Sequence, residues 1–168
     1  IGQAGFLQHI IAEGIARHKR IQKKYTIKGN AIAGYGIYAT QIIQANELIF
    51  NGEGTSPRLI TRRYVEKNWN ETEKEIFRRY AYPVINAVFL LWDHDPSAWA
   101  PQNHSCQPNT VYDGLNVIAT MTITPGQELT LDSSSFLYNR MEPFECRCGT
   151  ANCQGPLKGK PGHYVNAR

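Results

Sequence analysis

The sequence predicts a mainly β domain with a few helices, and three observations support this class. Short stretches rich in β-branched and aromatic residues recur along most of the chain. Glycine-containing turns separate these stretches, and the strand–helix alternation that builds parallel sheets is missing from the pattern. The chain has 168 residues, 42% of them hydrophobic, which is enough for one domain with its own core.

The first segment, residues 1–24, is expected to be a helix followed by basic residues. Apolar residues within 3–20 recur at the spacing of one buried helical stripe, namely Leu7, Ile10, Ile11 and Ile15. We interpret the basic residues that follow as a solvated face, and a nuclear-import or nucleic-acid patch stays an alternative.

From residue 25 the pattern changes to short strands broken by glycines. Three stretches have strand character: Tyr25–Ile27, Gly36–Ala39 and Glu47–Phe50. A turn is expected at Asn51–Gly54, where asparagine and glycine lie together.

Two helices are expected next, and each has a recognisable start. Thr61 is placed at the N-cap of the first helix, and Asn70 with Glu73 forms a capping box at the start of the second. The residues expected to face inward are Tyr64, Val65, Trp69, Ile76, Phe77 and Tyr80.

The second half of the chain is expected to return to β structure. Tyr82–Trp92 has β character, and short strands are expected around Val111 and over Val117–Met121. A turn at Thr124–Gly126 leads into a strand at Gln127–Asp132, and the remainder is expected to be loop.

Composition narrows the class of protein. Eighteen basic and fourteen acidic side chains give a net charge of +4, which suits an anionic or mixed-charge partner without identifying one. No apolar run approaches the ~18 residues of a membrane span, and we expect no signal peptide. The expected location is intracellular, either nuclear or cytoplasmic.

The positions of the four cysteines are the most informative feature. Cys146, Cys148 and Cys153 form a C-x-C-x4-C cluster, and Cys106 lies 40 residues before Cys146. Four thiolates are a complete ligand set for a structural zinc ion. Two disulfides in an exported protein are the alternative, and a reducing compartment fits the spacing better.

Two further segments carry candidate chemistry. Gly34-Tyr35-Gly36 is followed by a strand, so it does not fit a dinucleotide-binding loop; it is either a plain hairpin turn or a turn whose backbone approaches a ligand. His104 lies in an irregular segment beside Cys106, where backbone groups are free to bind. We interpret Asp93-His94-Asp95 as a solvated loop.

These segments belong to an ordered set of motifs. Gly34–Gly36, Asn103–Asn109, Gly126–Asp132 and Cys146–Cys153 together resemble the SET-domain protein lysine methyltransferases with a post-SET zinc motif. The resemblance covers about residues 25–155. It implies several small β-sheets with a knot-like threading, and methyl transfer from S-adenosylmethionine (SAM) to a protein lysine, with histones among the expected substrates.

The resemblance also assigns domains and site residues. It implies a SET domain at 25–141, a post-SET zinc segment at 142–162 and a tail at 163–168. SAM would be held by Gly34, Tyr35, Gly36, Asn103, His104 and Leu157. Zinc would be held by Cys106, Cys146, Cys148 and Cys153.

The chain departs from the family pattern at one position. Ser133 stands where the family usually has its catalytic tyrosine, and Phe136 and Tyr138 could restore an aromatic wall from the neighbouring loop. Ser133 and Tyr138 are the catalytic candidates, and ordinary packing is the alternative for Tyr138.

Two alternatives to full activity stay open. One is a weakened or inactive SET module that binds SAM, a peptide or a protein partner. The other is a zinc-dependent nucleic-acid binder, but basic residues are not arranged in a stripe outside 17–28, so direct nucleic-acid binding is not expected.

Overall fold

The computed structural model describes residues 22–55, 58–85, 87–92, 99–136 and 143–159. The expected N-terminal helix, the Asp93–Asp95 loop, Tyr138 and the tail at 163–168 lie outside these ranges, and the division into domains stays a prediction. No helix within the described ranges is long and apolar enough to cross a membrane.

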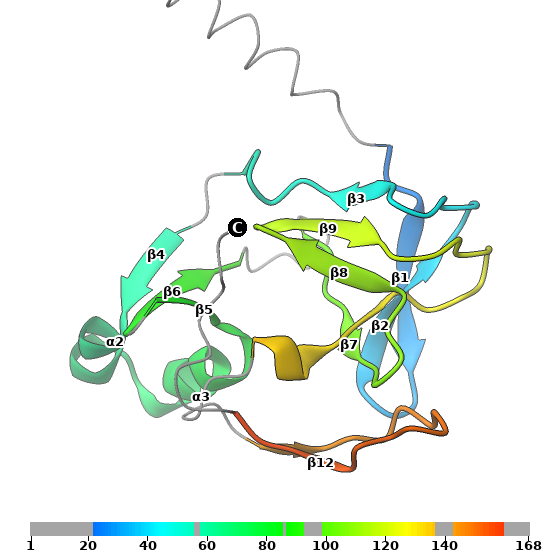
Figure 1. The fold of residues 1–168 in the computed structure, drawn as a ribbon. Coiled ribbons are helices and arrows are strands. Elements are labelled where there is room, and N and C mark those ends of the chain that lie inside the picture. The colour runs from blue at the N-terminus through cyan, green and yellow to red at the C-terminus, as the bar shows by residue number, and fades with distance from the viewer. Residues whose placement is uncertain (1–21, 56–57, 86, 93–98, 137–142, 160–168) are drawn as a thin grey trace, which may run out of the picture.

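The described chain is mainly β, as predicted, and its strands form five small sheets (Figure 1). The N-terminal pair is the antiparallel hairpin of β1 (Tyr25–Asn30) and β2 (Gly34–Ala39). A three-stranded sheet in the order β3-β9-β8 joins Leu48–Phe50, Asn116–Ala119 and Thr110–Asp113. Around these strands lies the largest core cluster, which includes Ile37, Ile43, Val117, Ile123 and Leu129.

A second three-stranded sheet, in the order β4-β6-β5, forms the opposite side of the molecule (Figure 1). Its strands are Arg58–Thr61, Val88–Leu91 and Tyr82–Ile85. The predicted β stretch at 82–92 is thus two strands, separated where Ala87 adopts a φ of 62°. We call this sheet and its two helices the helical lobe.

The two helices of the lobe begin at the positions predicted from their capping residues. Thr61 Oγ1 accepts from Tyr64 N at the start of α2 (Arg62–Asn68). At the start of α3 (Glu71–Tyr80), Asn70 and Glu73 form the reciprocal capping box, at 3.0 and 2.8 Å.

Two of the residues expected to face inward on these helices do not. Val65 and Phe77 are buried with Phe89 in the lobe's own core, and Trp69 packs against them half-buried. Tyr64 and Ile76 are 54% and 51% exposed, so these predictions are wrong. Each lies one residue, about 100° of helix, before the buried position, and the helices bury only a narrow stripe.

Two two-stranded pairs lie near the cysteines. β7 (Asn103–His104) pairs in parallel with β10 (Thr130–Leu131), and β11 (Phe144–Glu145) pairs with β12 (Pro156–Leu157). The expected strand at 127–132 is shorter than predicted because residues 127–129 bond to β2 instead, through Ala39 N to Gln127 O and Leu129 N to Ile37 O.

A few local predictions differ from the structure. β11, β12 and the 3-10 helix Ser133–Ser135 occupy a region expected to be loop. The strand expected at 117–121 ends at Ala119. The knot-like threading implied by the resemblance stays a prediction.

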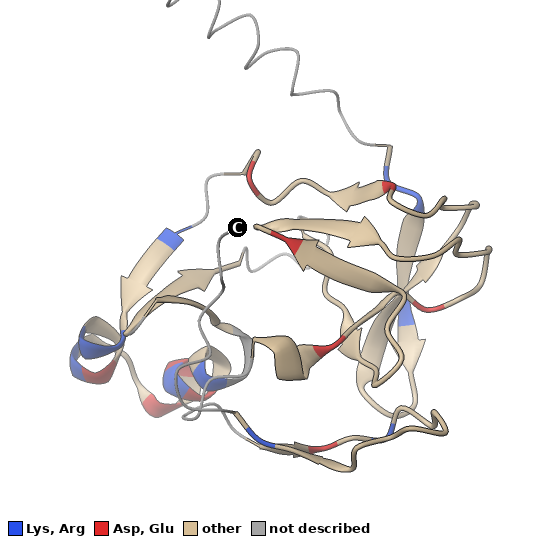
Figure 2. Cartoon of the chain, in the orientation of Figure 1, with Lys and Arg blue, Asp and Glu red and all other residues tan. Residues whose placement is uncertain are grey.

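Charged residues gather on the two helices, where both signs alternate (Figure 2). Lys74 pairs with Glu71 at 3.0 Å on α3, and Arg78 reaches the same carboxylate at 4.0 Å. The helices therefore present a mixed surface, not a basic one.

Candidate active site and cysteine centre

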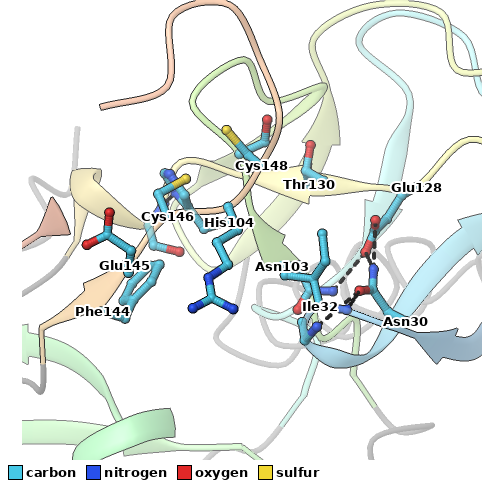
Figure 3. A pocket seen from close by; sticks show the side chains of 14 residues that line it. Asn30, Ile32, Asn103, His104, Glu128, Thr130, Phe144, Glu145, Cys146 and Cys148 are labelled. Carbon is cyan, nitrogen blue, oxygen red and sulfur yellow. Dashed lines mark hydrogen bonds between the residues drawn. The ribbon is translucent and has the colours of Figure 1, made fainter. Parts of the chain in front are cut away.

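A cavity of ≈410 Å³ lies where the β1–β2 turn, β7, β10 and the cysteine segment meet. Its size is typical of small-molecule sites, which span about 300–1,000 Å³. Figure 3 shows Asn30, Asn103 and Glu128 at one end of this cavity, and His104, Phe144 and Cys146 at the other.

The first end is polar and is organised by one carboxylate. Glu128 Oε1 accepts from Asn103 Nδ2 at 2.7 Å, and both Glu128 oxygens accept from Asn30 Nδ2 at 3.1 Å. Asn30 Oδ1 in turn accepts from the backbone N–H groups of Ile32 and Ala33, at 2.9 and 3.0 Å. The Glu128 carboxylate therefore joins the β1–β2 turn to β7.

The glycine turn lies directly against this network. Asn103 Nδ2 also donates to the backbone carbonyl of Tyr35, at 2.7 Å. A Cβ added at Gly36 would collide with Glu128 Oε1 and would lie 3.0 Å from Asn103 Nδ2. Gly34 has a φ of 84°, a conformation that glycine adopts readily. Gly36 is thus required for close approach and Gly34 for the turn.

His104 links the cavity to the cysteines. Its Nδ1 accepts from Ser133 N at 3.1 Å, so its proton is on Nε2, which lies 3.3 Å from Cys106 Sγ. Burial lowers the pKa of His104, although Asp132, 3.6 Å from Nδ1, acts in the opposite direction. The imidazole is therefore a neutral donor to sulfur.

Asn109 fixes the backbone between Glu128 and β10. Its Nδ2 donates to Glu128 O at 2.8 Å, and its Oδ1 accepts from Thr130 N at 2.9 Å. The side chain thus satisfies backbone groups that a neighbouring strand would otherwise pair.

The four cysteines meet at the far end of the cavity. Their sulfurs all lie within 4.8 Å of one another, and Cys106 Sγ is 3.8 Å from Cys146 Sγ. A tetrahedral zinc site with Zn–S bonds of about 2.3 Å places its sulfurs about 3.8 Å apart. None of the four is disulfide-bonded, so the disulfide alternative is wrong, and the thiol set fits a zinc ion in number and spacing.

Hydrogen bonding and burial shift the pKa values of two of these thiols in opposite directions. A hydrogen bond from Thr150 lowers the pKa of Cys148 to about 5, and burial raises the pKa of Cys146 to about 12. Gln154 N also donates to Cys106 Sγ at 3.3 Å. A cation would favour the thiolate form at all four positions.

Leu157 lies beneath the cysteines. It is 3% exposed and packs with Cys146, Cys106 and Cys148, while Phe144, its β11 partner, lines the cavity. Phe144 also meets the His104 ring edge-on, with centroids 5.7 Å apart. Phe144 therefore lines the cavity, and Leu157 does not.

Ser133 lies at the start of the 3-10 helix and lines the cavity. Its backbone N–H is used by His104. Asp132 Oδ1 accepts from Ser134 N at 2.9 Å and so fixes this turn.

An aromatic cluster not foreseen as a unit lies next to this turn. The rings of Tyr82, Tyr112 and Phe136 contact one another with centroids 5.0–5.7 Å apart, and Trp92 joins at 6.2 Å from Tyr82. Trp92 in turn stacks on Trp99. Burial raises the pKa of Tyr82 to about 12 and also raises that of Tyr112, so both hydroxyls stay protonated.

Comparison with known proteins identifies this architecture. The sequence matches the SET domain family over residues 34–132, more than half of the chain. The chain belongs to the SET-domain family. The match includes the glycine turn, β7 and Glu128, and ends at Asp132.

Relatives of this SET domain are large proteins. It is 27% identical over 160 residues to a variant-silencing SET domain-containing protein of Plasmodium falciparum, covering 89% of this chain and 6% of that protein. It is 25% identical over 161 residues to the histone-lysine N-methyltransferase ash1 of Drosophila melanogaster, covering 91% of this chain and 7% of the relative. The chain therefore spans a small part of these relatives.

Solved structures agree with the fold. The methyltransferase domain of human SETMAR superimposes with a TM-score of 0.58 at 16% identity, covering 83% of this chain and 60% of that one. KRYPTONITE, solved with mCHH DNA, an H3(1–15) peptide and S-adenosylhomocysteine, gives a TM-score of 0.55 at 20% identity, with 83% and 30% covered.

The SET domain brings together most, but not all, of the residues assigned from sequence. Asn103 and His104 line the cavity, whereas the turn Gly34–Gly36 does not line it and contacts Asn103 through the Tyr35 carbonyl. Asn30 and Phe144 were missed, and so was the role of Glu128. Glu128 lay inside a motif, whereas no signal in the sequence marked Asn30 or Phe144.

Proposed function

We propose that this SET domain transfers a methyl group from SAM to a lysine amine of a protein, with histones as the first substrates to test. The observation that carries the proposal is the cavity itself, which the motif residues Asn103, His104 and Glu128 line and beside which the four cysteines meet.

The cavity fits SAM in chemistry as well as in size. Asn103 supplies an acceptor oxygen for an amino group, and Phe144 with His104 supplies ring surface for an adenine. The backbone at Gly36 comes close because no Cβ intervenes. We assign these residues to SAM, with Gly34 and Tyr35 shaping the turn. Leu157 would act indirectly, by supporting the cysteine segment.

The four cysteines would hold zinc as a structural crosslink. Cys106 follows β7, and Cys146 and Cys148 belong to the segment 144–148 that lines the far end of the cavity. A metal bound there fixes both sides of the cavity without taking part in the reaction.

The lysine must reach the cavity as a neutral amine. A free lysine has a pKa of ~10.4, and an apolar surrounding lowers it because the charged form is poorly solvated there. We propose that Tyr82, Tyr112 and Phe136 form this surrounding, since their rings cluster beside the turn that carries Ser133. The walls would also bind the ammonium head before it loses its proton.

When bound, SAM supplies a methyl group on a positively charged sulfur, which is already electrophilic. The protein's task is therefore alignment of the amine with that methyl. Ser133 lines the cavity but its hydroxyl is short, so we assign the hydroxyl that faces the amine to Tyr112 or Tyr82, with Tyr138 as the remaining candidate.

The direct test is transfer of radiolabelled methyl from SAM to recombinant histones and to a mixed protein extract. Incorporation that depends on lysine supports the proposal. A folded, zinc-loaded protein that binds SAM but transfers no methyl group would rule out catalysis. The second candidate function, a binding module, would then remain.

The second candidate function rests on Ser133. A SET module that binds SAM or a peptide without efficient transfer would gain activity on Ser133→Tyr. A gain of tenfold or more would mean that the native site is disabled, because a positioned hydroxyl contributes ~10²–10³ in rate. No gain, or a loss, supports an enzyme that uses another tyrosine.

Location and partners follow from the relatives. Several relatives are named histone-lysine N-methyltransferases, including the H3 lysine-36 specific enzyme of Saccharomyces cerevisiae, 28% identical over 157 residues. We propose a nuclear or cytoplasmic protein with a lysine-bearing protein or peptide as partner. We do not propose direct nucleic-acid binding, because charges of both signs alternate on the helical lobe.

A further inference from the structure

Glu128 is a half-buried carboxylate that the proposed reaction does not use, yet it accepts hydrogen bonds from the side-chain amides of Asn30 and Asn103. Its position is held from three directions. Its backbone forms a bridge to Tyr38 in β2, its carbonyl accepts from Asn109, and its oxygens hold Asn30 and Asn103.

This arrangement decides which way the Asn103 amide faces. An amide has two N–H donors on Nδ2 and one acceptor oxygen. Both donors of Asn103 are used inside the protein, by Tyr35 O and Glu128 Oε1, each at 2.7 Å. The reversed amide would place its oxygen against these two acceptors, which is unfavourable.

The acceptor oxygen of Asn103 is the atom left for a ligand. Among the residues that the structure describes, none donates to Asn103 Oδ1, and Asn103 lines the cavity. An unpaired amide oxygen beside a carboxylate selects a ligand group that donates hydrogen bonds and carries positive charge.

We propose that Glu128 is a positioning residue that fixes Asn103 with its oxygen toward the cavity, and so makes the site selective for the α-amino group of the SAM amino-acid moiety. The proposal rests on the proposed function, in which the cavity holds SAM. It adds that recognition of the amino group is set by a residue that acts through Asn103.

The test measures ligand selectivity, not activity. Isothermal titration calorimetry would compare S-adenosylhomocysteine with the analogue in which hydrogen replaces the α-amino group. Wild-type protein is expected to bind S-adenosylhomocysteine roughly 10- to 100-fold more tightly, the range for hydrogen bonds to a charged group.

Glu128→Gln tests the positioning role. The substitution keeps the size but turns one acceptor oxygen into a donor that faces the donors of Asn103 and Asn30, so Asn103 is expected to rotate. Affinity for S-adenosylhomocysteine should then fall by roughly 10-fold or more, while affinity for the analogue should change less than threefold. The matched control is Glu66→Gln, since Glu66 is exposed on α2.

Each outcome decides something. If wild-type protein binds neither compound, the proposed function fails. If wild-type binds both equally, the cavity holds the ligand but the inference is wrong, whatever the variants do. If Glu128→Gln weakens both equally, or neither, Glu128 is structural and the inference is wrong. Should Glu128→Gln not fold, Glu128→Asp keeps the charge with a shorter reach. Its preference for S-adenosylhomocysteine over the analogue must then be weaker than that of wild-type protein, and an unchanged preference would contradict the inference.

Discussion

The cavity and the neighbouring aromatic cluster are built in different ways. At the polar end of the cavity, Asn30, Asn103 and Glu128 are joined by hydrogen bonds of 2.7–3.1 Å, and the cysteine centre lies beyond His104. In the aromatic cluster, which lies beside the Ser133 turn and does not line the cavity, Tyr82, Tyr112 and Phe136 contact one another through ring faces and edges. Geometry is set by directional bonds in the cavity and by packing in the cluster.

This difference explains where the chain follows its family and where it departs. A hydrogen-bonded network tolerates few substitutions, because each lost partner leaves a buried polar group unpaired. A packed aromatic wall can be rebuilt from other rings, since size and shape are what it requires. Ser133 lies between the two, because it lines the cavity and belongs to the same turn as Phe136 of the aromatic cluster.

The largest effect is expected from breaking the cysteine centre. Cys146→Ser removes one of four sulfurs from a site whose metal, as a structural zinc, would contribute on the order of 10 kcal/mol. We expect loss of stoichiometric zinc by elemental analysis and loss of S-adenosylhomocysteine binding, because Cys146 also lines the cavity.

Wild-type protein stripped with a chelator and reloaded with zinc is the control. A metal-free protein that still binds the ligand with wild-type affinity would show that the polar end does not depend on the cysteines.

The next largest effect tests the aromatic cluster. Tyr112→Phe keeps the ring and removes the hydroxyl, so methyl transfer is expected to slow by ~10²–10³ if that hydroxyl faces the amine. Tyr82→Phe is the paired variant, and Tyr64→Phe is the control because Tyr64 is exposed on α2. Single-turnover rates would separate them. Equal rates for all three variants would mean that the hydroxyl comes from elsewhere.

A smaller effect tests the close approach at the polar end. Gly36→Ala places a methyl group against Glu128 Oε1, and overpacking of this kind costs about 1–3 kcal/mol. We expect S-adenosylhomocysteine affinity to fall by roughly 10-fold or more. Gly29→Ala is the matched control, since nothing lies within 4 Å of its added Cβ. Equal affinities in a calorimetric titration would contradict the assignment of Gly36.

The smallest effect separates the helical lobe from the site. Asn70→Ala removes the capping box of α3 and is expected to cost about 1 kcal/mol of unfolding free energy. Chemical denaturation would measure this, and zinc content with ligand affinity should stay unchanged. A loss of ligand affinity would show that the lobe and the cavity are coupled.

Local signals in the sequence predicted much of the fold. Thr61 and Asn70 cap their helices as expected, because capping depends on residues three positions apart. The buried faces of the same helices were predicted only in part, since Val65 and Phe77 are buried but Tyr64 and Ile76 are exposed. Tyr64 and Ile76 are as apolar as their buried neighbours, and only the tertiary packing decides which of them is covered.

The cysteine centre was predictable although its parts come from two motifs. The chain has only four cysteines, their count and spacing match one ligand set, and they do meet. The contacts of Glu128 with Asn30 and Asn103 could not be predicted, because they join segments 98 and 25 residues away along the chain. The aromatic cluster was missed for the same reason, since Tyr82 and Tyr112 come from separate sheets.

The span of these contacts has a consequence for how the protein is made. Asn30 leaves the ribosome long before Glu128, and the four-cysteine group that includes Cys106 cannot form until Cys153 has been synthesised. Contacts of such long sequence separation form slowly, and no fragment ending before residue 153 contains all four sulfurs. A nascent chain therefore carries an unfinished pocket with unpaired thiols until the last segment emerges, and termination before residue 153 yields a product that lacks part of the sulfur set.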